Sequence, residues 1–281
     1  MRDFYCVLDC RHNVITGATL PDNFKAILKQ VKPQMIVRSV DQGWTVVFHT
    51  SHGLLAQRIA SYLDVGSEVP YWFETQVAIG VHDDLHLVFG KGKREQLTQV
   101  GAPRDFSLVP MQDVDRVVQM EDRIDEGFRK HSWLGVMQSK HAECLYRGAD
   151  TAKDMERMLD TEKKRREVML KQLRVDATMV QKTYDWMHFC DRLSLILAGD
   201  DVPAMNRHLE IITNHEGTRF EIWQDENDRV RVSPWPFVGE KIELSIEYRT
   251  VKQLAFADDA ELGDALDACP VELLKMVISE N

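Results

Sequence analysis

The chain has 281 residues, of which 44% are hydrophobic and 28% are charged, and its formal net charge is −10. This length is sufficient to bury a sizeable hydrophobic core. The negative charge argues against a nucleic-acid binder that relies on bulk positive charge, because neutralising phosphates requires clustered lysine and arginine.

The cysteines and the hydropathy indicate a cytoplasmic protein. Five cysteines are scattered along the sequence, and an odd, dispersed set does not form a disulfide framework. The charged start of the chain lacks the features of a signal peptide. No apolar run approaches the roughly 18–20 residues of a membrane span. We therefore expect free thiols, a reducing compartment and no membrane contact.

The first half of the chain predicts a hairpin followed by two helices. Residues 1–34 form an N-terminal extension with one short strand and one short helix. Residues 35–51 alternate in hydropathy around Asp41-Gln42-Gly43, as a hairpin does. Thr50 or Ser51 can cap the next helix. The apolar stripe of that helix consists of Leu54, Leu55, Ile59 and Leu63.

A second helix is predicted over residues 71–84, which end in the segment Val81-His82-Asp83-Asp84-Leu85-His86. Residues 90–110 are rich in glycine, proline and polar residues, so they predict a long loop of the kind that often carries function. Two or three helices follow from about Met111 to Tyr146. Residues 150–198 predict a long helix pair with a methionine-rich stripe, which is typical of a helix–helix seam.

The pattern changes after Gly199. Residues 219–237 alternate around a polar turn and predict a hairpin, and residues 241–256 predict one or two further strands. The last stretch predicts a short helix and an end segment. We therefore expect a mainly α protein, with a helical domain over 35–200 and a small antiparallel β appendage over 201–281.

Histidines and aspartates provide the strongest functional signal. Imidazole nitrogens and carboxylate oxygens from several helices can converge on a metal ion inside a helical protein. Asp191 interrupts an otherwise apolar helix, and a buried carboxylate is costly unless it is paired or bound to a metal. The candidates are His49, His52, His82, Asp83, Asp84, His86, His131, His141, His188 and Asp191.

Their order resembles the HD superfamily of metal-dependent phosphohydrolases. That signature has one histidine, a His-Asp doublet, often further histidines and a distant aspartate on a later helix. The matching positions here are His52, His82-Asp83, His141 and Asp191, with His131 as a further candidate for the third position. The resemblance implies an HD-type helical bundle in which His52, His82, Asp83, Asp191 and His141 hold one or two divalent or iron-group metal ions.

A second resemblance is to an uncharacterised bacterial family of unknown function. It covers about residues 35–240. Val81 and Leu85-His86 depart from the pattern of that family, and His49 stands where it usually has glutamine. The matching blocks are Met35-Ile36-Val37-Arg38, His49-Thr50-Ser51-His52, Val81-His82-Asp83-Asp84, Ser139-Lys140-His141, Asp191-Arg192-Leu193-Ser194-Leu195 and Pro234-Trp235-Pro236-Phe237.

These residues predict a hydrolase of a phosphoester in a small molecule or nucleotide. A bound metal lowers the pKa of water and neutralises phosphoryl charge. Asp84, His86 or His141 could move the proton, and Lys140 or Arg192 could contact the anionic substrate.

Two alternatives remain open, together with one expectation about assembly. A di-iron oxygenase would recruit His131, His141 or His188 to complete its ligands. A degenerate metal site would leave a non-catalytic binding or regulatory protein. The methionine-rich helices over 150–185 either form a homodimer or close the bundle within one chain.

Overall fold

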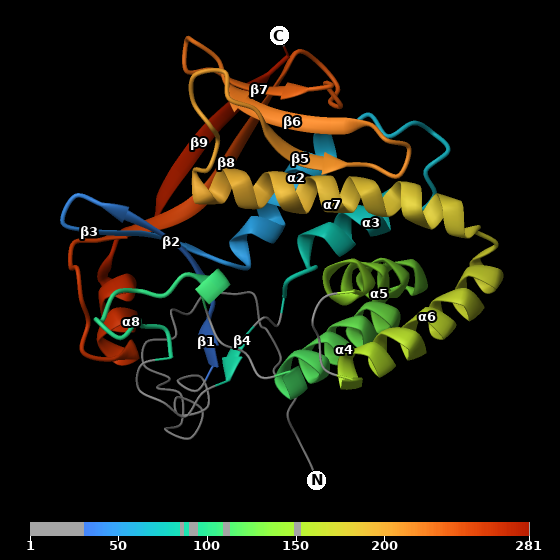
Figure 1. The fold of residues 1–281 in the computed structure, drawn as a ribbon, viewed down its shortest axis with the longest axis horizontal. Coiled ribbons are helices and arrows are strands. Elements are labelled where there is room, and N and C mark those ends of the chain that lie inside the picture. Colours follow the sequence, from blue (N-terminus) through green and yellow to red (C-terminus); the bar gives the residue numbers. More distant parts are fainter. Residues whose placement is uncertain (1–30, 85–86, 90–94, 109–112, 149–152, 281) are drawn as a thin grey trace, which may run out of the picture.

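The structure is a computed structural model that describes residues 31–84, 87–89, 95–108, 113–148 and 153–280 (Figure 1). The strand and helix predicted within residues 1–30, and the candidate His86, lie outside these ranges. Most strands belong to one seven-stranded sheet, in the order β2-β3-β8-β9-β7-β6-β5. Its strands are β2 (Met35–Val40), β3 (Gly43–Phe48), β5 (Leu209–Thr213), β6 (Arg219–Gln224), β7 (Val230–Ser233), β8 (Lys241–Val251) and β9 (Glu272–Ser279).

This sheet contradicts the prediction of a mainly helical bundle with a small C-terminal antiparallel appendage. It curls into a half-barrel and includes β2 and β3, because β3 pairs with β8 through Trp44 and Val251. It is also mixed, since β7 runs parallel to β9 while the other neighbours are antiparallel. Two short strands, β1 (Val31–Pro33) and β4 (Leu87–Phe89), form a separate pair.

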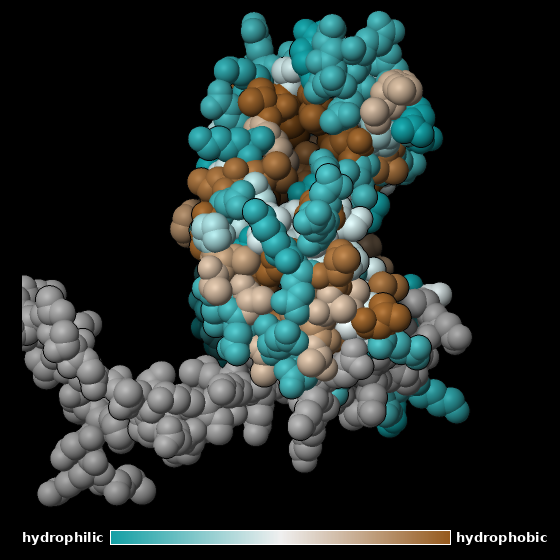
Figure 2. Space-filling model, turned by 90° about the vertical axis from the view of Figure 1, so that its left-hand side faces the viewer, coloured by the Kyte–Doolittle hydropathy of each residue, from teal (hydrophilic) through white to brown (hydrophobic). Residues whose placement is uncertain are grey.

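Strand β9 was predicted only as an end segment, although it lies between β8 and β7. The reason is its hydropathy, because apolar residues occur on both of its faces. Ile278 is fully buried, whereas Leu273 and Val277 are 55% and 51% exposed. Alternation is lost when both faces are apolar, and alternation is the sequence signal for a strand. Figure 2 shows the side of the molecule that lies on the left in Figure 1. Apolar side chains gather over its upper part, where the sheet lies.

In Figure 1, α7 runs across the view below strands β5, β6 and β7, and α4, α5 and α6 lie below α7. Helices α2 and α7 pack against it, α2 on β8 and α7 on β2 and β5, and both also contact α3. Helix α5 packs on α3, α4, α6 and α7. The two central helices, α2 and α7, therefore lie between the sheet and other helices. The helices are α2 (Ser51–Tyr62), α3 (Trp72–Gly80), α4 (Asp113–Lys130), α5 (Ser132–Tyr146), α6 (Lys153–Leu173), α7 (Ala177–Gly199) and α8 (Asp259–Ala268), with a 3-10 turn η1 (Phe106–Leu108).

The predicted hairpins, helix pair and short terminal helix are confirmed, with local corrections. Helix α2 begins at Ser51, but no side chain caps it, so the predicted capping role is wrong. Leu54 is 67% exposed and therefore does not belong to the buried stripe. Helix α3 ends at Gly80, before the His-Asp doublet.

The methionine-rich stripe of α6 is buried within the chain. Met155, Met158 and Leu159 pack with Met120 and Ile124 of α4. These side chains therefore contribute to the seam between α6 and its neighbours in the same chain. The homodimer through residues 150–185 stays a prediction.

Helices α2 and α3 approach closely where each has a glycine. A Cβ atom on Gly53 would lie 2.6 Å from the carbonyl oxygen of Gly80, and one on Gly80 would lie 2.6 Å from Oε1 of Gln57. The contact at Gly53 is with backbone and is too short for real atoms, so only glycine permits this spacing there, whereas the contact at Gly80 is with the end of a side chain that can move. The close approach brings His52, beside Gly53, next to the residues that follow Gly80.

We expect Gly53→Ala to lower the free energy of unfolding by about 1–3 kcal/mol, because the added methyl group must separate the two helices. Chemical denaturation measures this change. Gly263→Ala is the matched control, since a Cβ there meets nothing within 4 Å in another helix. It should be neutral or stabilising by up to about 1 kcal/mol. Equal effects of the two substitutions would contradict the role of the close approach.

Candidate metal centre

The structure brings the five predicted metal ligands together at the centre of the molecule. His52 lies in the first turn of α2, and Asp191 lies in the middle of α7. The doublet His82-Asp83 lies in the turn after α3, and His141 lies on α5. A sixth residue, His49, joins β3 to α2. Three overlapping groups have ligand atoms within 4.8 Å of one another: His49, His52 and Asp83; His52, His82 and Asp191; and His82, Asp83 and His141.

The tightest group is formed by two imidazoles and one carboxylate. Nε2 of His52 lies 3.1 Å from Nε2 of His82, and Oδ1 of Asp191 lies 3.1 Å from His82 Nε2 and 3.4 Å from His52 Nε2. Both histidines are completely buried and Asp191 is nearly so. Buried charges of this kind require a partner of opposite charge, and a cation between these atoms meets that requirement.

Backbone carbonyl groups fix the tautomer of both central histidines. Nδ1 of His52 donates to the carbonyl oxygen of His49, and Nδ1 of His82 donates to that of Ile79 at 2.6 Å. A carbonyl oxygen can only accept, so Nδ1 carries the proton in each ring. Nε2 is then the basic nitrogen of each neutral ring, and the two basic nitrogens face each other. Such orientation of an imidazole through its other nitrogen is typical of metal ligands.

Asp83 uses its two oxygens differently. Oδ2 lies 3.4 Å from Nε2 of His52 and 3.7 Å from Nε2 of His49. Oδ1 lies 3.0 Å from Nη1 of Arg123, a buried residue of α4 that also donates to the carbonyl oxygen of His82. One carboxylate oxygen therefore faces the imidazoles and the other is held by a guanidinium group.

His141 completes the third group and is anchored by a tyrosine. Its Nδ1 lies 3.1 Å from the hydroxyl oxygen of Tyr184 on α7. The His141 ring lies edge-on to that of His82, with centroids 5.1 Å apart. Burial and the charge of His82 lower the pKa of His141 to about 3, so this imidazole is neutral at physiological pH. A neutral imidazole is the form that binds metals.

Opposite charges dominate the titration of His82 and Asp191. Burial alone would lower the pKa of His82, but Asp83 and Asp191 outweigh burial and raise it to about 9. Burial would likewise raise the pKa of Asp191, but the charge of His82 and its hydrogen bond to Asp191 hold it well below its usual range. Without a metal ion, a proton on His82 therefore provides the positive charge within the cluster. His49 differs, because burial and His52 lower its pKa to about 4.

The cluster forms one wall of a cavity of about 330 Å³. The other walls contain residues that the sequence analysis did not single out. Arg116 and Gln119 of α4 contribute a cation and an amide, Tyr146 of α5 contributes a phenol, and Phe106 of η1 contributes a ring. The cluster residues that line the cavity are His49, Asp83, His141 and Asp191. A small molecule in this cavity would therefore contact the metal-capable cluster directly.

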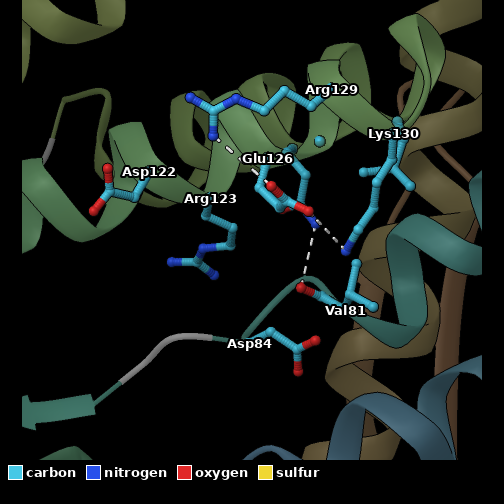
Figure 3. A pocket seen from close by; sticks show the side chains of 10 residues that line it. Val81, Asp84, Asp122, Arg123, Glu126, Arg129 and Lys130 are labelled. Atoms are coloured by element: carbon cyan, nitrogen blue, oxygen red, sulfur yellow. Dashed lines mark hydrogen bonds and ion pairs between the residues drawn. The ribbon is translucent and has the colours of Figure 1, made fainter. Parts of the chain in front are cut away.

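Asp84 lies apart from this cavity. It lines a separate pocket of about 480 Å³, together with Arg123, Glu126 and Lys130 of α4 (Figure 3). Burial raises the pKa of the Asp84 carboxyl. The structure thus separates Asp84 from Asp83, although the two were predicted to act at the same site.

The remaining candidates contact other groups. Lys140 pairs with Glu143 at 3.1 Å and lies over the ring of Tyr184. His131 accepts a hydrogen bond from the backbone N–H of Trp133 and caps α5. His188 stacks on Tyr184, and neither it nor His131 belongs to the three metal-capable groups of the described residues.

Comparison with known protein families gives a match over most of the chain. Residues 35–253 match the family described as a protein of unknown function (DUF3891). The chain belongs to this family. The matched region contains every ligand of the candidate metal centre, from His49 to Asp191. No curated protein matches the chain, and no solved structure does.

Membership of this family assigns no reaction, and the HD-type resemblance has no support beyond the order of its residues. The helical bundle implied by that resemblance is replaced by the curled sheet with its covering helices. Among the described residues, no helix has both the length and the apolar character needed to span a membrane.

Metal binding should release protons and strengthen with rising pH. His82 has a pKa of about 9, so it is protonated near neutrality, and a metal ion must displace that proton from Nε2. We expect about one proton released per ion at pH 7, and affinity for Mn²⁺ rising about tenfold per pH unit below the pKa. Calorimetry in buffers of different ionisation enthalpy measures both. A dissociation constant that is constant between pH 6 and 8 would contradict the assignment of His82.

Proposed function

We propose that this protein is a metal-dependent hydrolase that acts on a phosphoester of a small molecule or nucleotide. The observation that carries the proposal is the convergence of His52, His82 and Asp191, with Nε2 and Oδ1 atoms 3.1–3.4 Å apart, beside an accessible cavity. Clusters of imidazole and carboxylate ligands suit ions such as zinc, manganese and iron.

The donor set fits one or two metal ions. His52, His82, Asp83 and Asp191 would hold the first ion, and His49 or His141 would extend the set towards a second. A bound ion would supply a nucleophilic hydroxide near neutral pH and neutralise charge on a phosphoryl group. The chain itself fixes the orientation of the imidazoles, excludes bulk water from the cluster and lines the cavity beside it.

Arg116 is the group best placed to attract the anionic substrate. It belongs to α4 and lines the same cavity as Asp83, His141 and Asp191. A guanidinium group binds phosphoryl oxygens with paired hydrogen bonds. Phe106 and Tyr146 add ring surfaces to the same cavity, which favours substrates with an organic group of small size. Lys140, by contrast, is engaged with Glu143.

The cluster also suits the alternative of dioxygen chemistry at two iron ions. Four histidines and two aspartates contribute to the three groups, and mixed imidazole–carboxylate ligands are typical of such centres. The two activities require different assays. Loading the protein with Fe²⁺ without oxygen, followed by measurement of dioxygen consumption, tests this alternative separately from phosphoester hydrolysis.

We expect Asp191→Asn to lower metal affinity by at least about 100-fold. The substitution removes a proposed ligand, and even residues that only orient a ligand typically cost about 10–100-fold. The purified wild-type protein should contain one or two metal ions by elemental analysis and hydrolyse p-nitrophenyl phosphate or its bis ester. The variant should lose both properties. Asp185→Asn, on the same helix but bonded to His215, is the matched control and should retain them.

Three outcomes separate the alternatives. Wild-type protein that binds no metal would exclude both enzymes. Bound metal with dioxygen consumption and no hydrolysis would favour the di-iron oxygenase. Bound metal without either activity would favour a binding or regulatory protein.

Arg116→Ala should lower kcat/KM for the hydrolysed ester by about 10–100-fold, because a hydrogen bond to a charged group contributes about 1.5–3 kcal/mol. The loss should fall mainly on KM, since a protonated guanidinium group binds the substrate anion and does not ligate the metal. Steady-state kinetics measure this split. Arg129→Ala on the same helix is the control, because that side chain is 70% exposed and lines the other pocket. A large loss of metal content in Arg116→Ala would contradict the assigned role.

A further inference from the structure

We propose that Arg123 is a positioning residue that holds His82 and Asp83 so that both face the same metal ion. The inference rests on the proposed metal centre. It identifies the residue that orients two of the proposed ligands towards the ion. Arg123 belongs to α4, and none of the described residues of that helix belongs to the three metal-capable groups. Its side chain reaches across to the turn that follows α3 and is 4% exposed.

The two residues of the doublet cannot converge on one ion within a regular helix. Neighbouring side chains of a helix point about 100° apart around its axis. The chain avoids this problem by ending α3 at Gly80, so that His82 and Asp83 lie in a turn. A turn lacks the continuous hydrogen bonds that make a helix rigid. The carbonyl oxygen of His82 instead accepts a hydrogen bond from Nη1 of Arg123.

The same guanidinium group also fixes the orientation of the Asp83 carboxylate. Nη1 of Arg123 lies 3.0 Å from Oδ1. This contact sets the rotation about the last bond of the side chain and directs Oδ2 towards the imidazoles. Oδ2 then lies 3.4 Å from Nε2 of His52 and 3.6 Å from Nε2 of His82. A single arginine therefore acts on both residues of the doublet.

The positive charge of Arg123 and its positioning role should change metal affinity in opposite directions. A guanidinium cation next to a ligand carboxylate repels a metal ion, so charge alone predicts tighter metal binding after its removal. Positioning predicts the opposite, because the free carboxylate and the loosened turn must be ordered again when the metal binds. The sign of the change in affinity distinguishes the two effects.

Arg123 also lines the pocket shown in Figure 3, which contains none of the metal-capable residues. Arg123 lines this pocket of about 480 Å³ with Asp84 and Gln138. Truncation at residue 123 would extend the pocket towards the turn. A small soluble guanidinium compound could then occupy the place of the missing side chain.

The test compares Mn²⁺ binding by the full-length wild-type protein, Arg123→Ala and Arg123→Lys, using calorimetry and the electron paramagnetic resonance spectrum of bound Mn²⁺. We expect Arg123→Ala to bind about 10–100-fold more weakly, with a broadened spectrum. Arg123→Lys keeps the charge but lacks the planar fork, so it should recover only part of the affinity. Millimolar methylguanidinium should restore binding to Arg123→Ala but should not affect wild type. A residue needed only for general stability would not show this rescue.

Arg129→Ala is the matched control, because it removes an exposed arginine from the same helix and should leave Mn²⁺ binding unchanged. Equal or tighter binding by Arg123→Ala, or absence of rescue, overturns the positioning role while the proposed function stands. If Arg123→Ala does not fold, Arg123→Lys decides, and an unchanged dissociation constant overturns the inference. Wild-type protein that binds no Mn²⁺, Zn²⁺ or Fe²⁺ overturns the proposed function itself.

Discussion

A buried carboxylate in the middle of a core helix is the constraint around which the site is arranged. Asp191 is 5% exposed and lies on α7 between Cys190 and Leu193, which are completely buried. An isolated carboxylate in this position would cost several kcal/mol. His52 and His82 approach it with their basic nitrogens, and each is held there by a backbone carbonyl group. The arrangement of α2 and of the turn after α3 follows from that requirement.

The sheet fixes the two central helices on which these residues depend. Helix α2 rests on β8, and α7 rests on β2 and β5. Phe189 of α7 packs against Phe220 of β6 with ring centroids 5.2 Å apart, two residues before Asp191. The metal-capable groups therefore lie on the side of these helices that faces α3 and α5. A rigid support of this kind suits a site whose ligand atoms must be placed within a few tenths of an ångström.

The sequence was more informative about the site than about the fold. The order of histidines and aspartates, its resemblance to the HD superfamily and the apolar surroundings of Asp191 together selected His52, His82, Asp83, His141 and Asp191, which the structure brings together. The sheet could not be selected in this way, because the paired residues of β3 and β8, such as Trp44 and Val251, are about 200 positions apart and β9 carries apolar residues on both faces. Periodicity describes single elements and cannot reveal such long-range pairing.

Arg116 and Arg123 were missed for a different reason. Helix α4 is rich in charges of both signs, as exposed helices are, so its two inward arginines resemble their exposed neighbours. Only the packing of α4 on α5 shows which of its arginines is buried. Asp84 illustrates the converse. Its position beside Asp83 suggested a shared site, but the turn directs consecutive side chains into different pockets.

The pairing of β3 with β8 also determines when the site can form during synthesis. His49 follows β3 directly, and β3 is completed on its other edge by a strand that begins at Lys241. The ribosome therefore has to release the chain as far as Val251 before the support of His49 and His52 is complete. Metal binding would then follow folding, because the ligands are brought together only in the folded chain. A truncated or misfolded chain would carry the same histidines and aspartates without gathering them.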